Sequence, residues 1–424
     1  MPNSQPATAS VPRIGHPHSP SRDHAHDNAH DIRRADRDVL AWSHLADRFD
    51  PPVRHDGQSG ALEGILVGVK DVIDVAGMPT RCGSEAMPAH DSVFDAACVS
   101  QLRRAGAVLV GKTVTAEFAF RQPGPTRNPR RDGHTPGGSS SGSAAAVAAG
   151  MVPLALGTQT GGSIIRPAAF CGVIGFKPSF GGVLRDGLKL TCDSLDTIGW
   201  FAADMALAQT AADVLLPYAP DVPAHRFSKV ALIPDAADHP VDADARDALL
   251  AACARLRGLG VQVVERSRFA HAAELAELHT VIMTYEFSRN LQAIVDSRPS
   301  QLSASLRQTV IDGQHLSRAE YTDARRAQRR LRHDWRGIVG ADIDAVLTYS
   351  APGAAPAGLQ STGSSAFNRQ WSLLGWPCLH LPTSDNALGL PLGVQLVSDF
   401  ESDHTLLAAG RAWHDHLRVT RDAT

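Results

Sequence analysis

Short apolar runs, separated by glycine, proline and charged residues, alternate with helical patterns along this chain. A helix is predicted from Asp38 to Arg48. The apolar, partly β-branched run at 65–69 is flanked by glycines and predicts a buried strand that ends at Lys70. A helical pattern at 96–105 leads into the apolar run 107–110, which suits a second buried strand. The predicted order is therefore strand, helix, strand.

The same alternation continues to the end of the chain. Two loops rich in glycine, at 133–142 and 157–163, flank an alanine-rich helix that is predicted from 143 to 150. Farther along, helical stretches alternate with three more predicted strands, at 229–233, 261–265 and 343–349. Alternation of this kind implies an α/β fold with a largely parallel sheet covered by helices.

The first 35 residues differ from the rest of the chain. They are mostly proline, serine, aspartate and histidine, with little to bury, so we expect a disordered tail over 1–35 and one domain over 36–424. Five histidines between His16 and His30 could bind a metal ion, although a soluble extension explains them without that assumption.

Composition narrows the classes of function. With 424 residues, 43% of them apolar, the chain can bury a large core. Its 41 Lys and Arg against 44 Asp and Glu leave a net charge of -3, which argues against nucleic-acid or anionic-membrane partners. No apolar run reaches the roughly 18 residues of a membrane helix, and no signal peptide is visible, so the default location is cytoplasmic. The six cysteines lack metal spacing and predict buried free thiols.

Two segments match known motifs without their structural context. GAVLVGKT at 106–113 fits the phosphate-loop pattern, but its strand-like residues lie between the glycines instead of before them. GSSSG at 138–142 fits the nucleophile elbow of α/β-hydrolases and would make Ser140 the nucleophile. No strand pattern precedes that segment, so we expect neither motif to function.

Lys70 and the glycine loop suggest a third chemistry. A serine nucleophile needs a neutral base, and a buried lysine can supply one whereas arginine cannot. Only five of the 41 cations are lysines, so a lysine at the end of an apolar strand suggests such a role. The alternative is that Lys70 simply ends the strand and has no part in catalysis. In the loop from Thr160 to Ser163, Gly161 and Gly162 would let backbone N–H groups converge on an oxyanion.

Taken together, these segments closely resemble the amidase signature family of serine amidohydrolases. The resemblance covers roughly residues 38–415 and rests on GVKDVIDVAGMPT around Lys70, GGSSSGSAAAVAAG, LGTQTGGSIIRPAAFCGVIGFKPSFG, SLDTIG, FNRQWSLLGWPCLHLP and LPLGVQLV. In that family the two catalytic serines lie 24 positions apart, as Ser139 and Ser163 do here. The resemblance implies Lys70 as base, Ser139 as bridging residue, Ser163 as nucleophile, and the backbone of Thr160, Gly161, Gly162 and Ser163 as oxyanion hole.

The resemblance also implies the fold and the reaction. The fold would be one α/β domain with a large, twisted mixed sheet, helices on both faces, and a cis peptide between Gly138 and Ser139. The reaction would split a small carboxamide into carboxylate and ammonia through an acyl-enzyme, with no metal or organic cofactor. The sequence leaves open whether the protein is a monomer or a homodimer.

The type of family member is less well defined. The rival is the glutaminase A subunit of tRNA-dependent amidotransferase, but those proteins usually read DTGGSIR, where this chain has Gln159 and places Arg166 three residues after Ser163. We therefore expect a stand-alone amidase, similar to small malonamidase-type enzymes. Arg166 either binds a substrate carboxylate or supports the loop by pairing with an acid such as Asp196. The substrate pocket is expected from the variable region at about 205–340.

Overall fold

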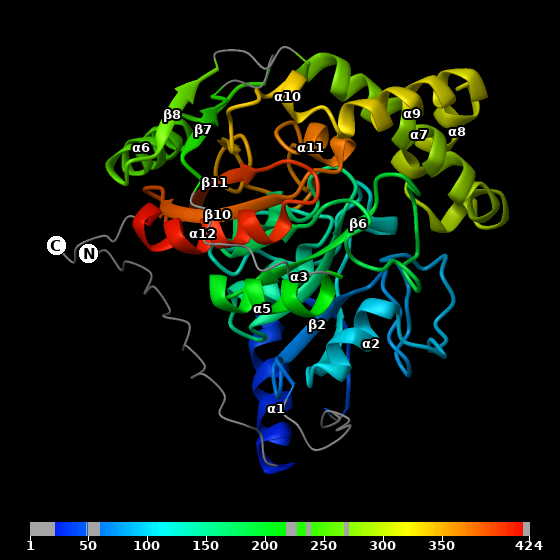
Figure 1. Cartoon of the computed structure of the whole chain (residues 1–424). Coiled ribbons are helices and arrows are strands. Elements are labelled where there is room, and N and C mark those ends of the chain that lie inside the picture. Colours follow the sequence, from blue (N-terminus) through cyan, green and yellow to red (C-terminus); the bar gives the residue numbers. More distant parts are fainter. Residues whose placement is uncertain are drawn as a thin grey trace, which may run out of the picture.

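The computed structural model describes residues 22–47, 49, 60–217, 227–234, 239–266 and 271–418 (Figure 1). The strands are β1 (Trp42–Leu45), β2 (Leu66–Lys70), β3 (Val108–Thr113), β4 (Leu154–Gln159), β5 (Ile174–Lys177), β6 (Thr197–Ala202), β7 (Lys229–Leu232), β8 (Gln262–Glu265), β9 (Ala345–Tyr349), β10 (Cys378–Asp385) and β11 (Pro391–Val397). The helices are α1 (Arg22–Val39), α2 (Ala97–Arg104), α3 (Ser141–Ala148), α4 (Ile165–Cys171), α5 (Met205–Leu215), α6 (Ala243–Gly258), α7 (Ala272–Ser297), α8 (Ala304–Gln314), α9 (Arg318–Arg332), α10 (Trp335–Ile338), α11 (Arg369–Leu374) and α12 (Asp403–Leu417), with 3-10 turns η1 (Glu117–Ala119) and η2 (Pro299–Gln301).

In the described part of the chain, eleven strands form one sheet in the order β1-β3-β2-β4-β6-β5-β10-β11-β9-β7-β8. Strands β3, β2 and β4 run parallel near one end, and β9, β7 and β8 run parallel at the other. The strands between them, from β4 through β6, β5, β10 and β11 to β9, pair antiparallel. The expected largely parallel sheet is therefore wrong, and the mixed sheet is confirmed. The C-terminal strands β10 and β11 enter the middle of the sheet and join its two parallel parts.

Helices cover both faces of this sheet. Side chains alternate across a strand, so neighbouring residues of β4 and β6 face opposite layers. Leu156 and Trp200 belong to a core that includes α2, α5, α6 and α12, whereas Ala155 and Phe201 belong to a second core with α1 and α3. Strands β2, β3 and β9 are buried at every position and therefore mostly apolar, which is why they could be recognised in the sequence.

The N-terminal elements differ from the prediction. Residues 42–45 were expected in a helix but form β1, which pairs antiparallel with β3 at the edge of the sheet. Residues 22–35, expected as tail, belong to α1, while residues 1–21 lie outside the described ranges. Ala29 and Ile32, three positions apart on α1, are buried against α3 and the sheet. An apolar stripe this narrow does not stand out in a segment that is otherwise polar, so the sequence did not indicate a buried helix here.

The other predicted elements lie within a few residues of those observed. The phosphate-loop look-alike at 106–113 is mostly strand β3, so its Lys112 and Thr113 stand in a sheet and not in a loop. All six cysteines are buried and free, as predicted.

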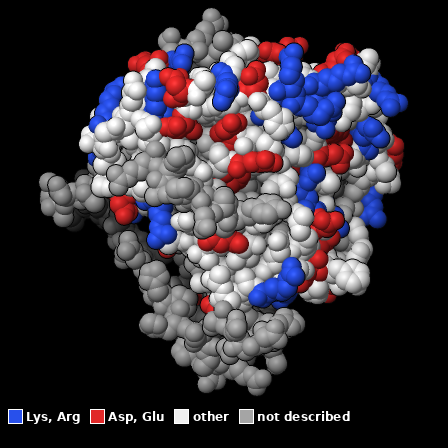
Figure 2. All heavy atoms as spheres, viewed as in Figure 1, with Lys and Arg blue, Asp and Glu red and all other residues white. Residues whose placement is uncertain are grey.

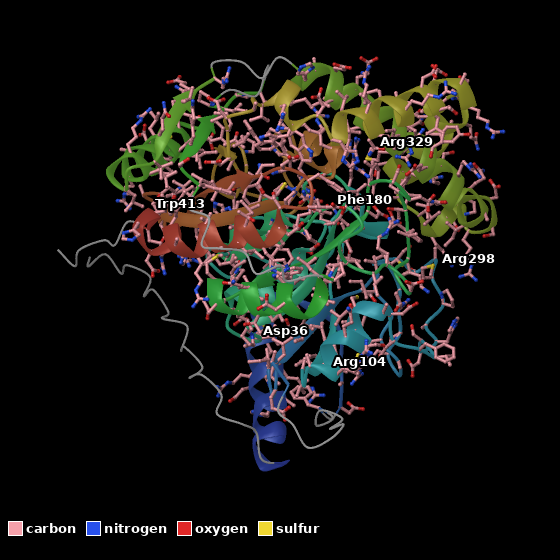
Figure 3. The ribbon with its side chains drawn as sticks, viewed as in Figure 1. Asp36, Arg104, Phe180, Arg298, Arg329 and Trp413 are labelled. Atoms are coloured by element: carbon pink, nitrogen blue, oxygen red, sulfur yellow. The ribbon has the colours of Figure 1, made fainter. Side chains whose placement is uncertain are left out.

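The outer surface carries an uneven distribution of charge. Cations gather at the upper right of the view in Figure 2, where Figure 3 places Arg329 on α9. That helix contains six arginines, Arg318, Arg325, Arg326, Arg329, Arg330 and Arg332. None of the described helices is both long and apolar enough to span a bilayer. Within the same ranges, no group of three or more His, Cys, Asp and Glu side chains could hold a metal ion.

Candidate active site

Lys70 ends β2 with its side chain fully buried. Its Nζ lies 2.8 Å from Ser139 Oγ and 2.7 Å from Thr158 Oγ1, and it forms no salt bridge with the residues described. Burial lowers the pKa of Lys70 to about 7; the charge of Asp196 opposes this shift and that of Arg166 adds to it. Since a charged amine without a carboxylate is costly to bury, the neutral form is readily accessible at this position.

Ser139 lies two residues before helix α3, directly after a cis peptide bond from Gly138. Its side chain is fully buried, and its carbonyl accepts a hydrogen bond from Ala116 N at 3.0 Å. The next residue, Ser140, binds the backbone N–H and C=O of Thr158, both at 3.2 Å, through its hydroxyl. Ser140 therefore joins α3 to β4, and no strand precedes it as a nucleophile elbow would require.

The glycine loop between β4 and α4 turns its carbonyl groups toward the protein. The carbonyl of Thr160 accepts from His279 Nε2 at 2.9 Å, and that of Gly161 accepts from Ser372 Oγ at 2.7 Å. The backbone N–H groups of Gly161, Gly162 and Ser163 donate to no residue in the described ranges. The loop thus leaves adjacent donors free beside the Ser163 hydroxyl, as a developing oxyanion requires.

Gly162 is needed for close packing. A Cβ at this position would lie 2.6 Å from Asn368 Oδ1 and 2.9 Å from Ser365 Cβ, whereas a Cβ at Gly161 would meet nothing closer than 3.7 Å. The two glycines therefore have different roles: Gly162 allows the 365–368 segment to approach, whereas a Cβ at Gly161 would make only ordinary van der Waals contacts.

Thr158 and His279 were not recognised in the sequence as supporting residues, and Asp196 was expected to support the loop only by pairing with Arg166. Asp196, within SLDTIG, accepts a hydrogen bond from Thr160 Oγ1 at 2.5 Å and others from the Thr191 and Cys192 backbone. Burial lowers the pKa of His279 to about 4, so this side chain is neutral when its Nε2–H donates to the loop. Thr158 is the second partner of Lys70. Neither Thr158 nor His279 has a sequence signal of its own, because their roles depend on contacts between distant elements.

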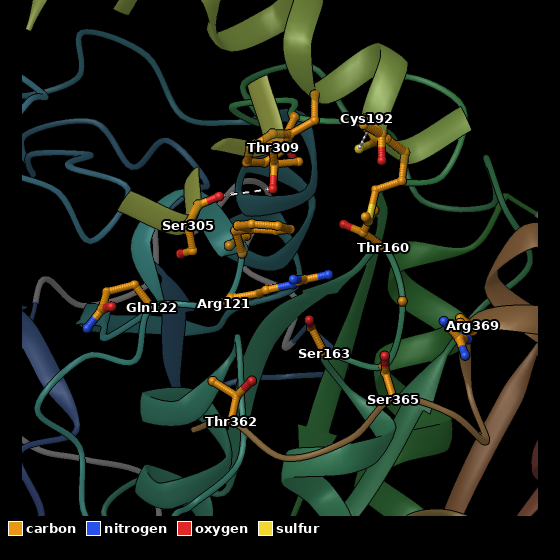
Figure 4. A pocket seen from close by; sticks show the side chains of 18 of the residues that line it. Arg121, Gln122, Thr160, Ser163, Cys192, Ser305, Thr309, Thr362, Ser365 and Arg369 are labelled. Carbon is orange, nitrogen blue, oxygen red and sulfur yellow. Dashed lines mark hydrogen bonds between the residues drawn. The ribbon is translucent and has the colours of Figure 1, made fainter. Parts of the chain in front are cut away.

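A cavity of about 580 Å³ opens over the glycine loop (Figure 4). Thr160, Gly161, Gly162 and Ser163 line it, whereas Lys70 and Ser139 are buried and do not. The other walls come from the segment 119–123, from Thr191 and Cys192, from α7 and α8, and from 360–369. The expected pocket region, 205–340, therefore supplies only part of the lining.

Arg166 lines the cavity but is bonded to the protein. Its NH2 donates to the Gly138 carbonyl at 2.5 Å and to Thr362 Oγ1 at 3.2 Å, and its NH1 donates to the Gly363 carbonyl at 2.9 Å. The expected pairing with Asp196 is absent from the contacts described. Arg166 instead connects the Gly138–Ser139 peptide to the 362–363 segment.

Comparisons with known proteins agree with this architecture. The family model described as Amidase matches residues 38–407. The A subunit of glutamyl-tRNA(Gln) amidotransferase from Rhodopirellula baltica is 31% identical, with 90% of each chain covered. A crystal structure of an amidase has a TM-score of 0.83 at 28% identity and covers 93% of this chain and 95% of its own. Peptide amidase from Stenotrophomonas maltophilia has a TM-score of 0.78 at 26% identity, with 94% of both chains covered.

The family match thus spans the segments that build the sheet, the glycine loop and the cavity. Both structural relatives share the α/β architecture over nearly the whole chain. This chain belongs to the amidase signature family.

Proposed function

We propose that this chain is a serine amidohydrolase that cleaves the C–N bond of a small carboxamide. The observation that carries the proposal is the position of Lys70: a fully buried amine with a pKa lowered to about 7, whose contacts are two hydroxyls. One of these hydroxyls belongs to Ser139, and the cavity beside the glycine loop is lined by Ser163. Family membership supports amide hydrolysis as the class of reaction.

In the proposed mechanism, Ser163 Oγ attacks the amide carbonyl carbon while its proton passes to Ser139 and the Ser139 proton passes to neutral Lys70. The N–H groups of the loop from Thr160 to Ser163 stabilise the oxyanion. The relay then returns a proton to the leaving nitrogen, the C–N bond breaks, and ammonia leaves an acyl-enzyme ester. Water attacks this ester by the same relay, which releases the carboxylate and regenerates the Ser163 hydroxyl.

Arg166 is a positioning residue in this scheme. Its donors hold the Gly138 carbonyl, so its guanidinium acts on Ser139 through the preceding peptide. Burial lowers the pKa of Arg166 to about 10, which leaves the group charged at neutral pH. The structural alternative for Arg166 is thus better supported than binding of a substrate carboxylate.

The test of the nucleophile combines a covalent label with an ammonia assay. A fluorophosphonate should label Ser163, and the Ser163→Ala variant should lose both the label and ammonia release from a panel of amides. The Ser140→Ala variant is the matched control, because Ser140 does not line the cavity. A label on Ser140, or ammonia release by Ser163→Ala at the wild-type rate, would disprove the assignment.

The second candidate is the glutaminase component of an amidotransferase. The curated relatives favour it, since those from Rhodopirellula baltica and Synechococcus are named as the A subunit of glutamyl-tRNA(Gln) amidotransferase. In this chain Gln159 stands before Thr160, with its Oε1 accepting from Ile164 N and Ile165 N, so a neutral amide caps α4 where the resemblance expects aspartate in those proteins. The catalytic machinery would be the same in both functions.

Assay of the purified chain alone separates the two candidates. A stand-alone amidase releases ammonia from amides without any partner and continues through many turnovers. The glutaminase of an amidotransferase would act on glutamine and would need its partner proteins for full activity. Gel filtration of the same sample tests monomer against homodimer.

A further inference from the structure

The cavity carries more positive charge than the reaction itself uses. Three arginines line it, Arg121, Arg166 and Arg369, against one carboxylate, that of Asp312. The terminal nitrogens of Arg166 already donate to protein oxygens. Asp312 accepts a hydrogen bond from Gln308 Nε2 and pairs with no cation in the described ranges. The cavity is therefore a cationic environment, which favours an anionic ligand.

Arg121 is the cation that is most available to a ligand. Its side chain is exposed and has no hydrogen bond or ion pair with any residue that the structure describes. Its Cζ lies 5.0 Å from the centre of the Phe120 ring, and Phe120 packs against Phe287 of α7 at 4.6 Å between ring centroids. Stacking holds the plane of a guanidinium and leaves its N–H edge free. In Figure 4, Arg121 reaches across the pocket toward the side with Thr160 and Ser163.

The backbone that carries Arg121 is tied to the catalytic segment. Ala116 N donates to the carbonyl of Ser139 at 3.0 Å. Between Ala116 and Arg121, Phe118 and Ala119 have φ angles of 46° and 55°, in the left-handed region that non-glycine residues rarely adopt. Such conformations persist only where the surrounding structure determines them, and they cluster at functional sites. The backbone from Ala116 to Ala119, which leads to Arg121, is therefore held beside Ser139 by the fold.

Arg369 is less suited to the same task. It lies beyond Ser365 in Figure 4, and its NH2 is 3.4 Å from His239 Nε2. Its Nε is buried and has no hydrogen-bond partner in the structure. Arg369 adds positive charge to the cavity, but Arg121 is the arginine whose side chain is free on its N–H edge.

We propose that Arg121 binds a carboxylate of the substrate, so that the site takes a carboxamide that also carries a carboxylate. The planar fork of a guanidinium matches a carboxylate in a bidentate geometry, and such charge-assisted bonds are strong and directional. This assignment rests on the proposed amidohydrolase function. Arg166 is not suited to bind this carboxylate, because its terminal nitrogens already donate hydrogen bonds to carbonyl oxygens of the protein.

Paired substrates isolate the contribution of the charge. Succinamate and glutaramate are compared with succinamide and glutaramide, in which a neutral carboxamide of nearly equal size replaces the carboxylate. The wild-type chain should prefer the acidic member of each pair. Glutamine is a further substrate to compare. A preference for glutamine over glutaramate would indicate that the ammonium group is bound as well, and Asp312 would be the residue to bind it.

The decisive variant is Arg121→Gln, with Arg127→Gln as matched control. Arg127 is an exposed arginine close by in the chain that does not line the cavity. Arg121→Gln should lower kcat/KM for the acidic amides by about ten- to a hundredfold, mainly through KM, and change it for the diamides by less than about threefold. Arg127→Gln should leave both unchanged. Thermal unfolding of each variant checks that the fold is intact.

The outcomes distinguish this inference from the function on which it rests. If the wild type is labelled by the fluorophosphonate but prefers the diamides, or if Arg121→Gln affects both substrates equally, the carboxylate assignment is wrong and the amidohydrolase function stands. A selective loss in Arg369→Gln but not in Arg121→Gln also overturns it. If the wild type neither takes the label nor releases ammonia from any amide, the proposed function itself fails.

Discussion

Two neighbouring strands each bury a lysine, and the two lysines have opposite surroundings. Lys70 on β2 and Lys112 on β3 are both fully buried, and β2 and β3 pair directly, with Val69 opposite Lys112. The amine of Lys112 lies 3.4 Å from the Asp71 carboxylate and also contacts Thr80 Oγ1 and the Pro79 carbonyl. Lys70 instead contacts two hydroxyls.

The difference shows that burial alone does not suit a lysine to act as a base. Burial lowers the pKa of both lysines, but at Lys112 the Asp71 carboxylate favours the charged form. A lysine with a carboxylate partner is a structural ion pair, whereas one with only hydroxyl partners can lose its proton and accept another. The rarity of lysine in the sequence therefore did not single out Lys70 as the candidate base, since Lys112 and Lys177 are buried too.

The largest effect is expected for Lys70→Arg. Arginine stays charged, so it cannot accept a proton through Ser139, and activity should fall by more than about a thousandfold, as in Lys70→Ala. Steady-state ammonia release measures this change. The control is Lys189→Arg, a partly exposed lysine that pairs with Asp74. If Lys70→Arg keeps more than about a tenth of wild-type kcat, Lys70 is not the base.

Lys112→Met should act on stability. Removing the cation leaves the Asp71 carboxylate buried without its ionic partner, which should lower the free energy of unfolding by about 3 kcal/mol. Denaturant unfolding at neutral pH measures the loss. The double variant that also changes Asp71 to Asn should recover part of it. An unchanged midpoint for Lys112→Met would mean that the pair contributes nothing.

The pH dependence of the reaction should follow Lys70. Because burial lowers its pKa to about 7, the amine is protonated below that value and neutral above it. The base must be neutral, so kcat/KM should rise about tenfold per pH unit up to about 7 and level off at higher pH. Initial rates across a pH series with a neutral amide test this. A profile that falls as pH rises through 7 would contradict the proposed protonation state.

A smaller effect is expected for Thr158→Val. The change removes one of the two hydroxyls that orient Lys70 and keeps the shape of the side chain. We expect kcat to fall by about three- to tenfold with little change in KM, because the amine can then rotate away from Ser139. The thermal midpoint is measured alongside to detect packing damage. A loss as large as that of Lys70→Arg would instead give Thr158 a direct part in proton transfer.

The predictability of each part of the fold depends on the range of the interactions that form it. Strands β2, β3 and β9 were predictable because they are buried at every position and read as mostly apolar runs. The edge strand β8 was predictable from its two central valines, although its residues are exposed or half-buried. β1 was not, because residues 42–45 become a strand only by pairing with β3, where Trp42 meets Thr113 from a distant part of the chain. Helix α1 was missed because its buried stripe, with Ala29 and Ile32, is narrow.

The sequence by itself determined the local chemistry: a lysine at the end of a strand, serines 24 positions apart, and a loop with paired glycines. These features lie in short segments whose spacing can be read directly. Only the tertiary structure decided which groups meet. It assigned Arg166 to the Gly138 carbonyl, joined Asp196 to Thr160, and brought Arg121 into the cavity with Ser163. Such contacts join elements that are distant in the chain, so they form only when the sheet order and helix packing bring those elements together.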